Sequence, residues 1–262
     1  MNVLELRNLG IKFTTPNNGR VSRRRIPHDN FNSDNFPLGR HKGQEDFWAF
    51  RNVSFSLKAG GYLGIIGKNG SGKSTLLRVI AGIYSPDEGD CTVLGRVGLL
   101  QVGLGFHNEL SGRDNIYISS SILGLKKKEI DAVYKDIVEF SELGRFIDVP
   151  LKAYSSGMVA RLGFATSINL KHDILLLDEV FAVGDESFRE KCKDKLREIK
   201  EAGKTVIVVS HNMREVKTLC ERTVVLEKGR VLFDGPSAEA VDLYVKRIAE
   251  KKQRGKALRE LQ

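Results

Sequence analysis

The chain has 262 residues, 41% of them hydrophobic and 29% charged, with 26 glycines against 6 prolines. This composition excludes collagen-like, low-complexity and wholly disordered chains, and the length allows one large domain or two small ones. The formal net charge of +9 is concentrated in two segments: residues 12–43 carry seven Lys and Arg against two Asp, and residues 246–262 carry seven against two Glu. The rest of the chain is close to neutral. The basic charge is therefore confined to these two segments and does not form one nucleic-acid-binding surface.

The sequence shows no sign of membrane insertion or secretion. No apolar run approaches the ~20 residues of a membrane-spanning helix, and the N-terminus lacks the basic start and long apolar centre of a signal peptide. The three cysteines, Cys91, Cys192 and Cys220, are odd in number and show no Cys-x-x-Cys spacing. They argue against a disulfide framework or a zinc site and fit a reducing cytosol. We therefore expect a soluble, cytosolic protein.

The first part of the chain predicts two strands separated by an insertion. Apolar residues from Val3 predict a strand that ends near Phe13, and the alternation of residues 48–57 predicts a second strand. Residues 14–46 between them are rich in Asn, Gly, Pro and Arg and have no apolar period. We interpret them as a basic insertion.

The next segments predict a buried strand and a helix. Residues 62–66 form a short apolar run suited to a buried strand, and a helix is expected from Ser74 to Gly82, where the glycine provides a C-cap. Residues 87–101 contain spaced glycines and are expected to form short antiparallel strands.

The remaining pattern indicates helices alternating with apolar strands. Residues of about 111–170 show mostly helical spacing. Residues 174–177 and 206–209 are continuous apolar strands on either side of a helix, and residues 223–233 predict a hairpin. Continuous apolar strands that alternate with helices predict a mostly parallel sheet covered on both faces.

Residues 67–74, Gly-Lys-Asn-Gly-Ser-Gly-Lys-Ser, match the phosphate-binding loop pattern between a strand and a helix. Glycines let backbone N–H groups turn toward phosphate oxygens, and the helix N-terminus adds partial positive charge. Lys73 is expected to reach the β- and γ-phosphates, and the Ser74 hydroxyl to ligate Mg²⁺. The alternative is a glycine-rich turn that happens to precede Lys-Ser. The nucleotide-binding residues expected here are Asn69, Gly70, Ser71, Gly72, Lys73, Ser74 and Thr75.

Polar residues follow two of the predicted buried strands. Asp178 and Glu179 come directly after residues 174–177, at the strand end where open α/β sheets bind ligands. Asp178 suits Mg²⁺, and Glu179 is placed to polarise the attacking water as a general base. The alternative is an acidic pair that caps the next helix. His211 follows residues 206–209 and is expected to reach the γ-phosphate, whereas a structural histidine is the alternative.

Tyr154-Ser155-Ser156-Gly157-Met158 begins a predicted helix. Ser155 is a natural N-cap, and the N–H groups of the first turn form an anion site. One phosphate loop already serves the nucleotide within a monomer, so a second anion-binding helix end makes sense if it faces the nucleotide of another subunit. By itself the signal is unspecific, because many helices begin with such a cap.

Together these features resemble the nucleotide-binding domain of ABC transporters over nearly the whole chain. Tyr154–Met158 stands where that family has its signature motif, usually Leu-Ser-Gly-Gly-Gln, and Ser155 and Gly157 match it. Tyr154, Ser156 and Met158 depart from it. These departures, the sequence Asp-Glu-Val-Phe-Ala-Val-Gly-Asp at residues 178–185 and the segment at residues 106–117 resemble the branch of the family that exports O-antigen, capsule and teichoic acid.

The resemblance implies an α/β fold of the P-loop NTPase, ABC type. It combines a mostly parallel sheet core with an antiparallel β subdomain and a helical signature subdomain at about residues 105–170. The nucleotide-binding domain is expected at residues 1–236, including the insertion at 14–46. A C-terminal helix and basic tail are expected at residues 237–262.

The resemblance also implies roles for individual residues. Gln101 stands at the Q-loop, which senses the metal and γ-phosphate and contacts the membrane subunit. Asp185 ends the D-loop, which crosses the dimer interface, although Ala182 stands where many relatives have Ser. Phe13 falls where an aromatic ring stacks on adenine. Trp48 is a rival for that role, and a core residue that closes the first strand is the alternative for Phe13.

The function implied is that of an ATP-hydrolysing homodimer that binds ATP and Mg²⁺ and drives polysaccharide export. Its expected partners are two copies of an ABC-2-type transmembrane permease and a lipid-linked polysaccharide substrate, which places it peripherally on the cytoplasmic side of the inner membrane. Because the chain ends at Gln262, the additional carbohydrate-binding domain of some members is not expected.

A soluble ABC-type ATPase acting on DNA or ribosomes is the alternative. Such proteins usually carry a long coiled-coil insertion or two cassettes, neither of which is present in the sequence, and we expect no nucleic-acid partner. A P-loop kinase or GTPase would not explain the helix that begins at Tyr154–Met158.

The two basic segments have separate interpretations. The first is expected to reach the membrane face, where anionic lipids or a pyrophosphate-linked substrate would meet Arg23, Arg24 and Arg25. A solvated, partly disordered loop is the alternative. The C-terminal tail is interpreted as a solvated helix.

Overall fold

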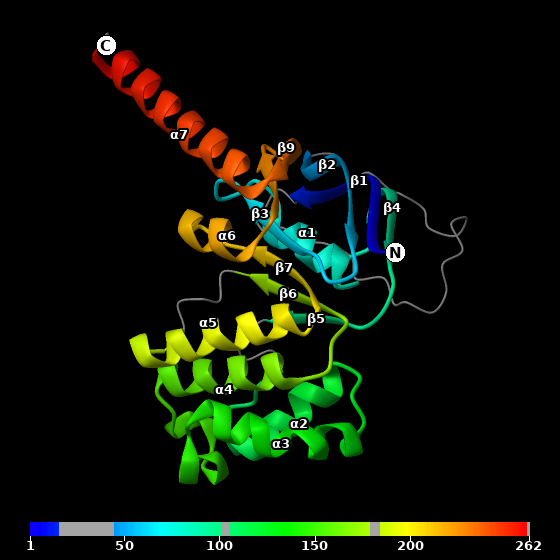
Figure 1. Cartoon of the computed structure of the whole chain (residues 1–262), viewed down its shortest axis with the longest axis vertical. Coiled ribbons are helices and arrows are strands. Elements are labelled where there is room, and N and C mark those ends of the chain that lie inside the picture. Colours follow the sequence, from blue (N-terminus) through cyan, green and yellow to red (C-terminus); the bar gives the residue numbers. More distant parts are fainter. Residues whose placement is uncertain (16–44, 101–104, 179–183, 261–262) are drawn as a thin grey trace.

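A computed structural model describes residues 1–15, 45–100, 105–178 and 184–260. The strands are β1 (Asn2–Thr15), β2 (Glu45–Lys58), β3 (Tyr62–Ile66), β4 (Glu88–Val93), β5 (Val97–Leu100), β6 (Ile174–Asp178), β7 (Thr205–Val209), β8 (Arg222–Glu227) and β9 (Arg230–Pro236). The helices are α1 (Lys73–Ile80), α2 (Gly112–Ile122), α3 (Lys127–Ser141), α4 (Ser156–Asn169), α5 (Glu186–Glu201), α6 (Met213–Leu219) and α7 (Ser237–Glu260), with 3₁₀ turns at Gly144–Asp148 and Leu151–Ala153. Figure 1 shows their arrangement.

The main sheet has the strand order β5-β6-β7-β3-β8-β9. All of its neighbouring pairs are parallel except the hairpin β8–β9. Every residue of β3 and β7 is buried, which explains why these strands are apolar on both faces. The prediction of a mostly parallel sheet is therefore confirmed.

A second sheet contains β2-β1-β4 and is antiparallel. Within residues 87–101 the sequence predicted antiparallel strands throughout, which is correct for β4 but wrong for β5. β5 pairs in parallel with β6, with Val97 opposite Ile174 and Leu100 opposite Leu177. Gly98 allows this approach, because a Cβ atom there would lie 2.4 Å from the ring of His172.

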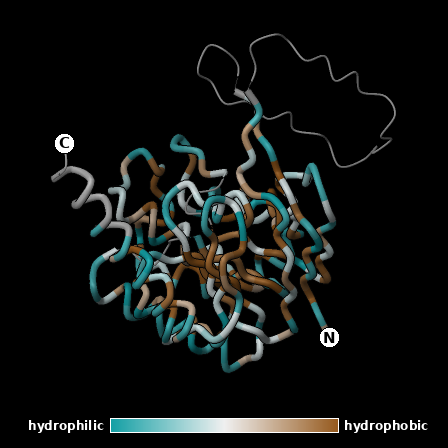
Figure 2. Tube along the Cα trace, turned by 90° about the horizontal axis from the view of Figure 1, so that it is seen from above, coloured by the Kyte–Doolittle hydropathy of each residue, from teal (hydrophilic) through white to brown (hydrophobic). Residues whose placement is uncertain are grey.

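Helices cover the main sheet on both faces, with an apolar interior (Figures 1 and 2). One face packs against α1 and the antiparallel sheet, in a core that includes Leu6, Leu76 and Ile207. The other face packs against α4, α5, α6 and the start of α7, in a core that includes Phe188 and its neighbours. A separate apolar cluster joins α2, α3 and α4. The sheet is thus held between two layers, and the signature segment belongs to a helical region with a core of its own.

Within the described ranges, no helix is both long and apolar enough to cross a membrane.

The three cysteines are free, and burial raises the pKa of the Cys192 and Cys220 thiols to about 12. These thiols are therefore neutral at physiological pH and act as small apolar groups of the core.

The main sheet should be sensitive to loss of side-chain volume. Leu176 in β6 is fully buried, whereas Leu94 is 45% exposed. We expect Leu176→Ala to lower the free energy of unfolding by about 2–5 kcal/mol, because it removes buried apolar contacts and leaves a cavity. Leu94→Ala is the matched control and should change that free energy by about 0.5 kcal/mol or less. Urea denaturation measures both, and equal effects would contradict the assignment of β6 to the core.

Candidate nucleotide-binding site

The parallel strands bring three chain segments to one edge of the main sheet. β7 lies between β6 and β3, and Val209 is opposite both Ile65 and Asp178. The phosphate loop begins two residues after Ile65, and His211 follows Val209 by two residues. Segments that are far apart in the sequence therefore emerge side by side, at the carboxyl edge where open α/β sheets bind ligands.

The phosphate loop has the backbone that its glycines predict. Gly70 and Gly72 adopt positive φ angles of 78° and 100°, a conformation that other residues rarely adopt. A Cβ atom at Gly72 would also lie 2.7 Å from the backbone oxygen of Ala49 in β2. Close packing against the antiparallel sheet, together with the positive φ angle, therefore requires glycine at this position.

Lys73 and Ser74 begin α1 directly after the loop. The Lys73 ammonium group is buried and donates hydrogen bonds to the backbone oxygens of Gly67, at 2.9 Å, and Lys68, at 3.2 Å. It is thereby held over the loop. Among the described residues, the buried Ser71 hydroxyl has no hydrogen-bond partner, so it is a polar group that a bound phosphate could satisfy.

Ser74 and Asp178 lie together although they are 104 positions apart in the sequence. The Ser74 hydroxyl donates a hydrogen bond of 3.3 Å to Oδ1 of Asp178. These are hard oxygen donors, which Mg²⁺ prefers, and they are few enough to leave positions for phosphate oxygens and water. The donor set therefore fits Mg²⁺ held jointly with a nucleotide. Within the described ranges, no cluster of three or more His, Cys, Asp or Glu residues could hold a metal by itself.

Some of the other residues predicted for this site are described by the structure, and the rest lie outside the described ranges. Asn69 and His211 are exposed, and Thr75 lies in α1. Gln101, Glu179 and Ala182 lie outside the described residues, as do Arg23, Arg24 and Arg25 of the basic insertion.

The signature segment forms a second polar site. Ser155 is the N-cap of α4, and its hydroxyl accepts a hydrogen bond of 3.2 Å from the backbone N–H of Met158. The Tyr154 hydroxyl donates to the backbone oxygen of Phe146 at 2.6 Å, which anchors the segment to the helical region. A cavity of about 630 Å³ lies against this helix end, lined by Ser155, Ser156, Gly157, Met158, Ala160, Arg161, Gly184 and Asp185.

This cavity contains a functional candidate that the sequence interpretation missed. Arg161 in α4 forms an ion pair of 2.6 Å with Asp185, which is itself the N-cap of α5. The only sequence signal is that Arg161 is the single charged residue within Ser156–Asn169. Periodicity assigns an isolated charge to the solvated side of a helix, yet the Arg161 side chain is only 19% exposed.

Phe13 and Trp48, the two candidates for stacking on adenine, lie in neighbouring residue pairs of strands β1 and β2. Phe13 is opposite Phe47, with ring centroids 5.8 Å apart, and Trp48 is opposite Lys12. The guanidinium group of Arg51 lies 4.5 Å from the centroid of the Trp48 ring. The Trp48 ring is therefore already covered by a cation.

Comparison with known proteins agrees with this geometry. The family model described as "ABC transporter" matches residues 50–182. The O-antigen export system ATP-binding protein RfbB of Klebsiella pneumoniae is 45% identical over 209 residues, which cover 79% of this chain and 85% of RfbB. The teichoic acids export ATP-binding protein TagH of Lactococcus lactis is 43% identical over 205 residues, which cover 78% of this chain but only 44% of TagH.

A solved structure shows the same fold. The dimeric ATP-binding cassette MJ0796, in a post-hydrolysis state bound to ADP and Pi, aligns with a TM-score of 0.68 at 21% identity. The alignment covers 89% of this chain and 98% of that chain. The fold, the matched family model and the relatives therefore agree, and this chain belongs to the ABC transporter family.

Proposed function

We propose that this protein is the ATP-hydrolysing subunit of a polysaccharide exporter. In this proposal it dimerises around ATP and drives a lipid-linked glycan through a separate transmembrane permease, at the cytoplasmic face of the inner membrane. The observation that carries the ATP-hydrolysing part of the proposal is the contact between Ser74 and Asp178 at the base of the phosphate loop. This contact brings together the two groups that bind a metal–nucleotide complex in P-loop ATPases.

The names of the relatives support export of a glycan. RfbB is described as an O-antigen export protein and TagH as a teichoic acids export protein, and both substrates are cell-surface polymers that contain sugars. These relatives favour export over the alternative of a soluble ATPase acting on DNA or ribosomes.

In the proposed mechanism, the loop residues and Lys73 hold the phosphates through backbone N–H groups and one ammonium group. Bound Mg²⁺ would neutralise charge that develops on the phosphate oxygens. Ser74 and Asp178 would hold it from the protein side, and Gln101 would be the residue that senses it. Glu179 accepts a proton from the attacking water, and His211 donates a hydrogen bond to the γ-phosphate.

Dimerisation completes the site in this proposal. Ser155 and Gly157 present the N-terminus of α4 to the nucleotide of the second subunit, since that helix end offers N–H groups to an anion. Asp185 lies beside them at the start of α5 and belongs to the segment that crosses the interface. Each nucleotide would thus lie between the phosphate loop of one subunit and the signature helix of the other.

Glu179→Gln tests the chemical step. The variant should bind ATP and dimerise, but its turnover should fall at least about 100-fold, because the amide cannot accept the proton of the attacking water. Phosphate release measures turnover, and size-exclusion chromatography with ATP measures dimerisation. Turnover at the wild-type rate would remove Glu179 from this role.

Phe13→Ala and Trp48→Ala separate the two aromatic candidates. Each ring has one neighbour over it, Phe47 over Phe13 and Arg51 over Trp48, and we propose Phe13 for adenine stacking because its position matches that of the stacking residue in the family it resembles. Phe13→Ala should raise the Kd for ATP on the order of tenfold, the usual scale for loss of one base-stacking ring. Phe13→Tyr should retain affinity, and Trp48→Ala should leave the Kd within about twofold. Titration calorimetry measures all three, and a larger loss with Trp48→Ala would reverse the assignment.

We propose that the membrane subunit contacts the exposed apolar face of α2. Ile118 and Ile122 are 36% and 59% exposed. Ile122 also lies against the backbone at Gly105, where a Cβ atom would approach its Cδ1 to 2.5 Å. Gly105 is four residues from Gln101, which we expect to contact the membrane subunit. Two exposed apolar side chains four residues apart on α2, one of them beside Gly105, suit an apolar or amphipathic partner segment.

Ile122→Asp tests this contact. The charge should weaken co-purification with the permease and abolish stimulation of ATP hydrolysis by it, while basal ATP hydrolysis by the isolated subunit stays unchanged. Ile83→Asp is the control, because Ile83 is similarly apolar and 39% exposed but lies after α1. Unchanged stimulation with Ile122→Asp, or equal losses in both variants, would exclude this face of α2.

A further inference from the structure

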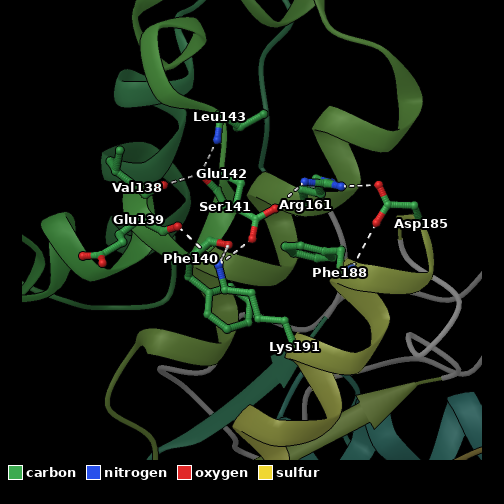
Figure 3. Close-up of polar contacts among 10 residues, drawn as sticks. All are labelled: Val138, Glu139, Phe140, Ser141, Glu142, Leu143, Arg161, Asp185, Phe188 and Lys191. Atoms are coloured by element: carbon green, nitrogen blue, oxygen red, sulfur yellow. Dashed lines mark hydrogen bonds and ion pairs between the residues drawn. The ribbon is translucent and has the colours of Figure 1, made fainter.

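Arg161 lies in α4, the signature helix, and connects it to the end of α3 and to the start of α5 (Figure 3). Its two terminal nitrogens bind different carboxylates: Nη2 donates to Asp185 at 2.6 Å, and Nη1 donates to Glu142 at 2.8 Å. The guanidinium group also lies 4.7 Å from the centroid of the Phe188 ring. The planar guanidinium group of arginine presents its two terminal nitrogens in fixed directions, whereas the ammonium group of lysine is a compact charge with rotatable donors on a flexible stem.

The Asp185 arm fixes the start of α5. One carboxylate oxygen of Asp185 binds Arg161, and the other accepts a hydrogen bond of 3.0 Å from the backbone N–H of Phe188. These donors hold the pKa of Asp185 below its usual value, with the Phe188 N–H making the largest contribution. Asp185 is therefore charged at neutral pH and is held by the helix it caps and by α4.

The Glu142 arm extends the connection to α3. Glu142 is the C-cap of α3 and binds Lys191 of α5 at 2.8 Å as well as Arg161. Lys191 also donates a hydrogen bond of 3.1 Å to the backbone oxygen of Phe140, in the last turn of α3. The Lys191 ammonium group is the main reason why the pKa of Glu142 is lowered. Two cations and two carboxylates thus close a loop of contacts among α3, α4 and α5.

This cluster of charged side chains lies beside the cavity at the N-terminus of α4. Arg161 and Asp185 line the same cavity as Ser155 and Gly157 at the N-terminus of α4. The ion pair therefore joins α4 to the start of α5 beside the helix end. A partner nucleotide that meets the helix end would also meet the segment that the ion pair holds.

We propose that Arg161 is a positioning residue that holds the signature helix and the Asp185 segment of one subunit in the geometry that receives the nucleotide of the second subunit. This inference rests on the proposed function, because it concerns the ATP-bound dimer. Arg161 contacts none of the phosphate-loop residues of its own chain in the ion pairs and hydrogen bonds described for it. Its loss should therefore affect dimerisation and turnover rather than binding of ATP to one subunit.

The experiment compares the full-length chain with its Arg161→Gln, Arg161→Lys and Asp185→Asn variants and with the double variant that combines Arg161→Gln and Asp185→Asn. Dimerisation with ATP is measured in the Glu179→Gln background, ATP affinity is measured by calorimetry at a protein concentration where the chain is monomeric, and kcat and KM are measured in chains with Glu179 intact. Arg113→Gln is the matched control, because Arg113 forms a 2.7 Å ion pair with Asp148 in the same helical region.

We expect Arg161→Gln to weaken ATP-dependent dimerisation on the order of tenfold, in the range typical of coupling between sites. It should lower kcat by a similar factor, while the monomer Kd for ATP stays within about twofold of wild type. Arg161→Lys should recover part of the loss. The effects of Arg161→Gln and Asp185→Asn should be less than additive in the double variant, because both remove the same contact. Arg113→Gln should behave as wild type.

Three results would overturn the inference while leaving the proposed function intact. These are wild-type dimerisation and kcat in Arg161→Gln, fully additive effects of Arg161→Gln and Asp185→Asn, or a loss that appears equally in Arg113→Gln and follows a lowered unfolding temperature. Absence of ATP-dependent dimerisation and of ATP hydrolysis in the wild-type chain would overturn the proposed function together with the inference.

Discussion

The site depends first on the parallel pairing of β3, β7 and β6. Because parallel strands all end at the same edge of a sheet, the phosphate loop, His211 and Asp178 emerge at one place although they come from distant parts of the sequence. The pairing in turn depends on strands that are buried on both faces, which is possible only where helices and a second sheet cover them. The contact between Ser74 and Asp178 follows from this pairing.

A second level of organisation lies in the helical region. The apolar cluster that joins α2, α3 and α4 is distinct from the cores that flank the main sheet, but α4 and Phe140 also pack against the core that contains Phe188, and polar contacts add to this packing. Arg161, Glu142 and Lys191 supply such contacts to the start of α5. Apolar packing forms each part of the molecule and also joins the helical region to α5, and a few charged groups at this boundary add direction-dependent contacts.

Much of the fold could be predicted, because the apolar patterns are strong. The continuous runs of β3, β6 and β7 and the stripe of α5 are read directly from local residue order. The strand β5 was misassigned because four residues with a glycine do not distinguish parallel from antiparallel pairing. That choice was made by contacts with residues 172–177, more than 70 positions later. In the site, Asp178 and the phosphate loop carry motifs, but Arg161 carries none and was missed.

The sequence by itself determined which segments become buried strands, where the loop with positive φ angles lies, and which polar residues follow the strand ends. These properties depend on residue type and local order, which set backbone freedom and the periodicity of apolar side chains. Only the tertiary structure decided the partner of β5, the covering of Trp48 by Arg51, and the sharing of Arg161 between Glu142 and Asp185. The β5 and Arg161 contacts join residues that are distant along the chain. All three depend on side-chain direction and distance in space, which the order of residues does not specify until the chain has folded.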